Sequence, residues 1–217
     1  KGIIQELKVL LKTKSIGTNS DRALLLDFQA TLETKPEKAI KLEKDALAQI
    51  ENITADNARL VSNLHANLGG LYRMNGYPDL AREHMEKSIS LLDQFNLLHI
   101  NDSIPQIANY AMFLTEQQEP ERGISELQKL SGIIKEYHSD HCLDYAKVQE
   151  TLGTIYLMTA NLPQAKTHFK RAFKIYEKIW ADEPEMIEAK YQEIQELYPQ
   201  IGFCIGKNLS GLLTKQT

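Results

Sequence analysis

The stretch that decides the fold runs from residue 152 to residue 172 and reads Leu-Gly-Thr-Ile-Tyr-Leu-Met-Thr-Ala-Asn-Leu-Pro-Gln-Ala-Lys-Thr-His-Phe-Lys-Arg-Ala. Apolar or small residues, and one tyrosine, stand at positions 152, 153 and 156 and again at 165, 169 and 172. This spacing indicates two amphipathic helices joined by a tight turn. Pro163 falls just inside the second helix, where its missing N–H costs nothing.

The same unit recurs along the chain at a period of 42 residues. Pro36, Pro78 and Pro120 follow one another at that interval, and three residues after each stands a small residue. One further period leads from Gly123 to Ala165. A fixed period of this size is typical of a stacked repeat protein. The first unit departs most from the pattern, since its set is Leu26, Asp27, Ala30, Ala39, Glu43 and Ala46.

These residues resemble the tetratricopeptide repeat (TPR) family. Leu68-Gly-Gly-Leu-Tyr72, like the stretch quoted first, is similar to the family's own pattern. The period is longer than the usual repeat of about 34 residues. It resembles the longer variety of kinesin light chains and of many bacterial regulators, as do residues 137–156. The resemblance implies an all-α fold, a right-handed superhelical stack of antiparallel helix pairs.

The repeat also predicts the division of the chain. Residues 1–19 are expected to be the tail of a truncated preceding repeat, and residues 20–182 to hold four TPR units. Residues 183–217 are expected to form a fifth first-helix and a C-terminal capping helix, the latter at about 200–214. Because the chain opens on Lys1, we expect it to be a fragment or a trimmed form.

Composition favours a protein of the cytoplasm. The 217 residues are 42% hydrophobic and 25% charged, which is ordinary for a globular protein. A net charge of −4 argues against direct binding to nucleic acid, which favours a basic surface. No apolar run approaches the roughly 20 residues that span a bilayer. Residues 1–20 lack the apolar core of a secretory signal, and two distant cysteines make no disulfide framework.

Catalysis needs a convergent set of groups, and the sequence offers none that convinces. The best metal candidate is the loop that contains His138, His141, Cys142 and Asp144, because histidine and cysteine ligate zinc. A structural zinc site needs four ligands in tetrahedral geometry, so a polar inter-repeat loop is the preferred interpretation. We therefore expect no enzyme, no cofactor and no metal. A helical-repeat enzyme or metal protein centred on this loop stays as an alternative.

The resemblance implies where a ligand would bind. In a TPR array the first helices of the pairs line a concave groove, and defined positions of each repeat contact the ligand. Carried onto this chain, the predicted groove residues are Asn63, Asn67, Arg73, Met74, Asn109, Met112, Lys147, Glu150, Thr151 and Thr154.

Asn67 and Asn109 form the most specific part of this prediction. They are one period apart, and an asparagine amide can pair with the peptide units of an extended chain. Asparagines at this position are frequent in the kinesin light chain type and are implicated there in peptide binding. We expect the replacement of both by alanine to weaken binding and to leave thermal unfolding nearly unchanged. The plain alternative is that asparagine merely tolerates a half-exposed helix face.

The favoured hypothesis is a non-enzymatic module that binds a peptide segment of a protein partner in its groove, as part of a larger scaffold or regulator. The alternative is the sensory or autoinhibitory half of a multidomain transcriptional or signalling regulator. Neither monomer nor dimer is favoured by the sequence.

Overall fold

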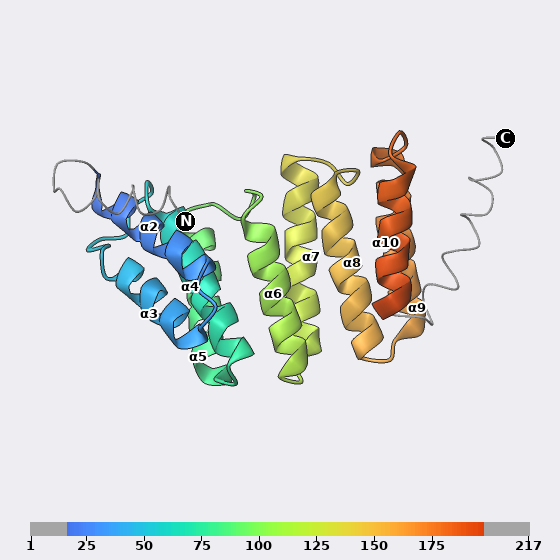
Figure 1. The fold of residues 1–217 in the computed structure, drawn as a ribbon. Coiled ribbons are helices and arrows are strands. Elements are labelled where there is room, and N and C mark those ends of the chain that lie inside the picture. The colour runs from blue at the N-terminus through green and yellow to red at the C-terminus, as the bar shows by residue number, and fades with distance from the viewer. Residues whose placement is uncertain (1–16, 198–217) are drawn as a thin grey trace. The chain divides into compact units, whose positions relative to one another are not determined.

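The structure is a computed structural model that describes residues 17–197, and this part of the chain is helical with no strand. Figure 1 shows its helices, which are α2 (Asn19–Thr31), α3 (Pro36–Leu47), α4 (Ala58–Met74), α5 (Pro78–Gln94), α6 (Ser103–Glu116), α7 (Pro120–Tyr137), α8 (Leu143–Met158), α9 (Leu162–Ile179) and α10 (Pro184–Leu197). The predicted all-α stack of helix pairs is confirmed.

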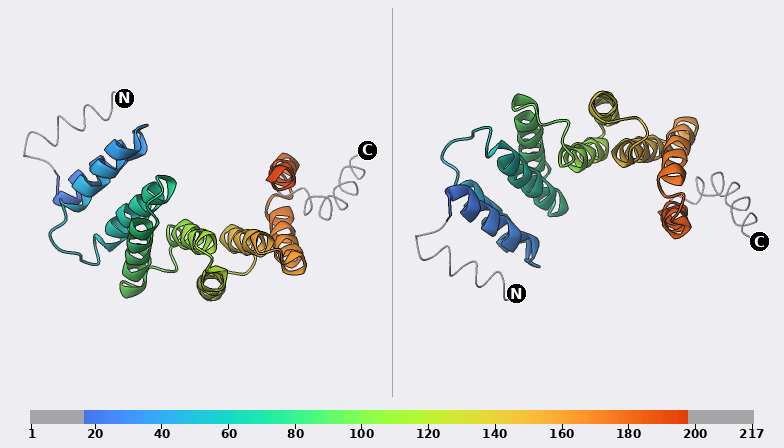
Figure 2. Two further views of the ribbon diagram at one scale, coloured as in Figure 1. Left: turned by 90° about the horizontal axis from the view of Figure 1, so that it is seen from below. Right: turned by 90° about the horizontal axis from the view of Figure 1, so that it is seen from above.

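The chain divides into two compact units, Lys1–Phe113 and Leu114–Thr217, which we describe separately. In the first unit α2 packs against α3, and α4 packs against α5 and α3. In the second unit α8 packs against α9 and α7, and α10 contacts α9. Figure 2 shows the same helices from below and from above. None of the described helices is long and apolar enough to cross a membrane.

Three of the turns between paired helices share one backbone conformation. Gly76, Gln118 and Ala160 all have positive φ, of 76°, 65° and 58°, and they are spaced by one period. In each turn the residue after the positive-φ position donates its backbone N–H to the carbonyl oxygen five residues earlier, at the end of the first helix. In the fourth pair, for example, the N–H of Asn161 donates to the carbonyl of Tyr156 at 2.7 Å. This is the helix-terminating pattern that a left-handed residue permits. A proline then occupies the first turn of α3, α5, α7 and α9.

Close approach of the helices depends on small residues at the crossings. A Cβ atom added to Gly69 would lie 2.6 Å from Cγ of Met85, and one added to Gly153 would lie 2.9 Å from the ring of Phe169. Opposite them, Ala81 and Ala165 are completely buried. The small and apolar residues that recur in the sequence are therefore the residues through which the two helices of a pair pack against each other.

Two predicted elements lie outside the described residues. These are most of the truncated repeat tail, at residues 1–16, and the capping helix, at residues 200–214. The predicted fifth first-helix falls in the region of α10, where Tyr191 and Ile194 are buried. The predicted domain boundaries themselves stay a prediction.

Candidate binding groove

The first unit has two adjoining cavities, of about 480 and 430 Å³, along its first helices. Both cavities are lined by Thr31 of α2, Ala66 and Asn67 of α4, and Asn109 of α6. We call the two cavities together the groove. Of the residues predicted to bind a ligand, Asn63, Asn67, Asn109 and Met74 line it. Arg73 and Met112 belong to the same unit but line neither cavity.

The amide of Asn67 is occupied by two carboxyl groups of neighbouring helices. Its Nδ2 donates to Oδ1 of Asp27 on α2 at 2.9 Å and to Oε1 of Glu43 on α3 at 3.2 Å. Glu43 is 2% exposed, whereas Asp27 is half-buried. Burial, followed by the charge of Asp27, raises the pKa of Glu43 to about 8. Burial also raises the pKa of Asp27, so the pair retains a proton that a solvated pair would lose.

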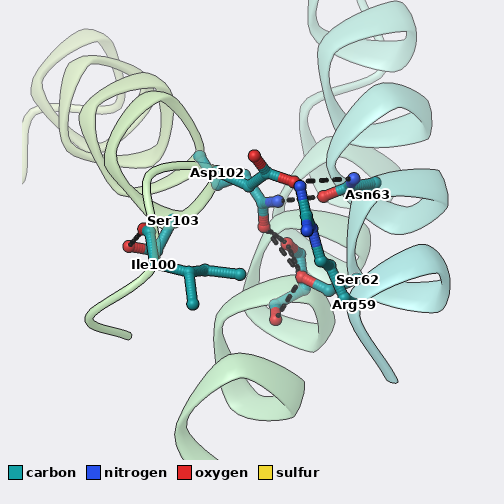
Figure 3. Close-up of polar contacts among 8 residues, drawn as sticks. Arg59, Ser62, Asn63, Ile100, Asp102 and Ser103 are labelled. Carbon is teal, nitrogen blue, oxygen red and sulfur yellow. Dashed lines mark hydrogen bonds and ion pairs between the residues drawn. The ribbon is translucent and has the colours of Figure 1, made fainter. Parts of the chain in front are cut away.

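Asn63 is also held by the protein itself, as Figure 3 shows. Its Nδ2 lies 3.4 Å from Oδ2 of Asp102, and its Oδ1 accepts from Nε2 of Gln106 at 2.5 Å. The same Asp102 oxygen accepts from Nε of Arg59 at 2.6 Å. The hydrogen bond from Arg59 holds the pKa of Asp102 below its usual value. Asn63 therefore belongs to a polar network that ties α4 to the start of α6.

Beneath this network lies a buried cluster of hydroxyl and amide groups. Oε1 of Gln106 accepts from Oγ of Ser62 at 2.8 Å and from Oγ of Ser88 at 2.5 Å. Ser62 and Ser88 are no more than 1% exposed, and Gln106 is 9% exposed. The cluster links α4, α5 and α6, and it satisfies polar groups that would otherwise destabilise the fold.

Asn109 differs from the other two groove asparagines. Its residue is exposed, as Asn67 is, but its side chain has no hydrogen bond to the described residues. Two exposed apolar side chains also line the groove, Phe28 at 55% and Met74 at 84% exposure. The groove therefore combines an amide that is free within residues 17–197 with apolar side chains that their neighbours leave exposed.

The remaining predicted residues lie on α8 of the second unit and are not part of this groove. Glu150 accepts from the hydroxyl of Tyr176 at 2.6 Å and pairs with Nζ of Lys190 at 2.8 Å. Burial lowers the pKa of Lys190, but the hydrogen bond and charge of Glu150 outweigh it and leave that pKa raised. The hydroxyls of Thr151 and Thr154 donate to carbonyls one turn back, and Lys147 is exposed. Glu150 thus connects α8, α9 and α10.

The second unit also has a cavity of about 530 Å³ that sequence reasoning missed. Its lining is mainly basic, with Lys135, Lys170, Arg171, Lys174 and Lys178. Three of these side chains recur every fourth residue of α9, which places them on one face of the helix. The local charge of this face is opposite to the net charge of the chain. The prediction of no direct nucleic-acid binding, which relied on net charge, stays a prediction.

The loop considered for metal binding serves to start α8. Sγ of Cys142 accepts from the backbone N–H of Tyr145 at 3.5 Å as the N-cap, and His141 pairs with Asp140. Within residues 17–197 no three His, Cys, Asp or Glu side chains come together as a metal site.

Comparison with known proteins identifies the repeat. The family model for the tetratricopeptide repeat matches residues 103–178. A crystal structure of BtubC (BKLC) from P. vanneervenii is similar, with a TM-score of 0.72, 17% sequence identity, and coverage of 98% of this chain and 87% of that chain. None of the curated proteins compared with the chain matches it.

Two related structures come from a Podosopora anserina putative kinesin light chain with nearly identical TPR-like repeats. One has a TM-score of 0.64 and 15% identity, and it covers 82% of this chain and 89% of that chain. The other, of a variant with one residue replaced, has a TM-score of 0.66 and 15% identity, with 83% and 90% covered. Residues 103–178 therefore match the tetratricopeptide repeat family, and the fold of the chain is similar to that of kinesin-light-chain-like TPR repeats. Proteins of this class are generally non-enzymatic protein–protein interaction scaffolds.

Proposed function

We propose that the chain binds an extended polypeptide segment of a protein partner in the groove of its first unit. The observation that carries the proposal is the exposed amide of Asn109, free within the described residues, beside two exposed apolar side chains, Phe28 and Met74. An amide supplies one donor group and one acceptor, which match the N–H and C=O of a peptide unit. Apolar side chains of the segment would cover Phe28 and Met74 and supply most of the affinity.

A substitution at Gly70 in the groove tests this proposal. A Cβ atom added to Gly70, which lines the groove on α4, meets no atom within 4 Å. The substitution Gly70→Phe therefore adds a large side chain to the groove lining at a position where its Cβ atom meets no neighbour, and it replaces a residue that weakens helices. Gly132 on α7 is equally open and lines neither cavity of the groove, so Gly132→Phe is a matched control.

Peptides that bind the wild-type chain are selected from a display library of random sequences. We expect them to bind Gly132→Phe with unchanged affinity and Gly70→Phe at least about tenfold more weakly, which corresponds to about 1.4 kcal/mol. If no sequence is enriched, or if the enriched peptides bind Gly70→Phe as well as wild type, the groove is not the binding site.

A further inference from the structure

The first helix pair carries two carboxyl groups where other pairs carry a packing contact. Asp27 and Glu43 precede Gly69 and Met85 by one period each. Gly69 and Met85 touch in the second pair, as Gly153 and Phe169 do at the same positions of the fourth. In the first pair both side chains are acidic, and one amide nitrogen reaches both.

This replacement is unfavourable for folding. Glu43 is 2% exposed, and its Oε2 has no hydrogen-bond donor among the described residues. Within residues 17–197, the side chains that bond to the pair or shift its pKa include no lysine or arginine. A buried carboxyl group without a cationic partner costs more than the small and apolar side chains of the other pairs. Apolar packing of the kind seen in the other pairs therefore does not account for these two residues.

The pair opens into the groove. Asp27 lines the first cavity, Glu43 lines the second, and Asn67 lines both. Asp27 is half-buried, whereas Glu43 is 2% exposed. A side chain that reaches this point from the groove meets three oxygen-bearing groups and no competing cation of the described residues.

We propose that Asp27, Glu43 and Asn67 form a receptor for a lysine or arginine side chain of the segment that binds in the groove. The identity of the segment as a groove ligand rests on the function proposed above, whereas the cation site stands on its own geometry. The ligand's N–H groups donate to the carboxylate oxygens, and the Asn67 amide orients those oxygens. The site selects against acidic side chains, which the two carboxyl groups repel.

Binding at this site releases a proton. Helix α3 packs against α2 and α4, and the groups that face Glu43 from them are the carboxyl of Asp27 and the neutral amide of Asn67. At neutral pH the empty pair holds one proton between its two carboxyl groups, because the pKa of Glu43 is raised to about 8. A bound ammonium or guanidinium group takes the place of that proton, which passes to the buffer. The charge of the pair changes from −1 to −2, and the ligand cation offsets the added charge.

The first test uses n-butylammonium, which reproduces the end of a lysine side chain and is charged at neutral pH. The carboxyl carbon of Glu43 is followed by carbon-13 NMR as pH is raised, with n-butylammonium or with uncharged 1-butanol at the same concentration. We expect the ammonium ion to shift the titration of Glu43 to lower pH and butanol to leave it unchanged. Equal titrations in the two solutions would overturn the cation site.

The second test uses the peptides selected from the random library. Lysine or arginine should recur at one position among them, and binding should weaken at least about tenfold in Glu43→Gln, which keeps the shape but not the charge. Calorimetry in buffers of different ionisation enthalpy should show release of about one proton with wild type and fewer with Glu43→Gln.

The outcomes separate this inference from the proposed function. Peptides that lose binding to Gly70→Phe, but lack a basic residue and bind Glu43→Gln normally, would overturn the cation site and leave the groove function standing. If no peptide is enriched, the groove function fails, and the n-butylammonium titration alone decides whether the cation site exists.

Discussion

Asn67 and Asn109 line the same groove one repeat apart, but the amide of Asn67 lies 2.9 Å from a carboxyl oxygen of Asp27 whereas that of Asn109 is free within the described residues. The two asparagines were equivalent by sequence. In the structure one supports the protein and the other faces the groove. This difference separates the effects that their replacements should have.

Asn67→Ala should destabilise the chain by about 1–3 kcal/mol, because it removes the hydrogen bonds to two partly or fully buried carboxyl groups. Asn109→Ala should change the free energy of unfolding by no more than about 0.5 kcal/mol, since its exposed side chain has no hydrogen bond to the described residues. Urea unfolding followed by circular dichroism measures both. Equal stabilities of the two variants would contradict the hydrogen bonds assigned to Asn67.

Replacing the acidic pair by the residues of the third pair should stabilise the protein. Ala111 and Leu127 occupy the positions that correspond to Asp27 and Glu43. The double substitution Asp27→Ala/Glu43→Leu restores a small residue against an apolar one. We expect the free energy of unfolding to rise by about 1–4 kcal/mol, as when other buried charged groups are replaced by packed apolar residues. A loss of stability would contradict the folding cost assigned to the buried acidic pair.

Stability should fall as the pH rises from about 5 to 8. The pKa of Glu43 is about 8 in the folded chain and near its ordinary value of 4.5 when unfolded, so the folded state holds the extra proton between these values. Its stabilising effect is complete below the unfolded pKa and is lost as pH rises through the folded pKa. The slope approaches about 1.4 kcal/mol per pH unit.

Glu43→Gln provides the control for this pH dependence, because its amide does not titrate. Urea midpoints of wild type and Glu43→Gln should diverge as the pH is raised, with wild type losing more stability. Parallel curves from pH 5 to 8 would mean that Glu43 titrates normally.

Because Ala160 has a left-handed backbone conformation, we expect its replacement by glycine to stabilise the fold. Its φ of 58° strains any residue with a Cβ atom, and glycine adopts it freely. Ala160→Gly should raise the free energy of unfolding by about 0.5–1 kcal/mol. At the neighbouring Thr159, where φ is −91°, the same change should destabilise the chain. Thermal unfolding compares the two, and the same sign of effect at both positions would contradict the assigned turn.

The helix pairs could be predicted because each repeats the same local spacing, and Gly69 with Met85 illustrates how that spacing becomes a packing contact. The groove site could be predicted only in part. Asn63 and Asn67 find partners 39 and 40 residues away, in Asp102 and Asp27, and no local pattern reveals such contacts. The sequence did hold one sign of this site, because Asp27 and Glu43 depart from the apolar pattern of the other 42-residue repeats. From the sequence, this departure marked only a weak repeat. The structure shows that both side chains bond to Asn67 and line the groove.

The most direct test of groove binding is a nitrogen-15 NMR spectrum of the side-chain amides with and without one library-selected peptide. The amide of Asn109 faces the groove without a partner among the described residues, so binding there must change its environment. We predict that Asn109 shows the largest shift, that Asn67 follows, and that neither moves in Gly70→Phe. Shifts confined to residues of the second unit, with Asn67 and Asn109 unmoved, would contradict the proposed groove.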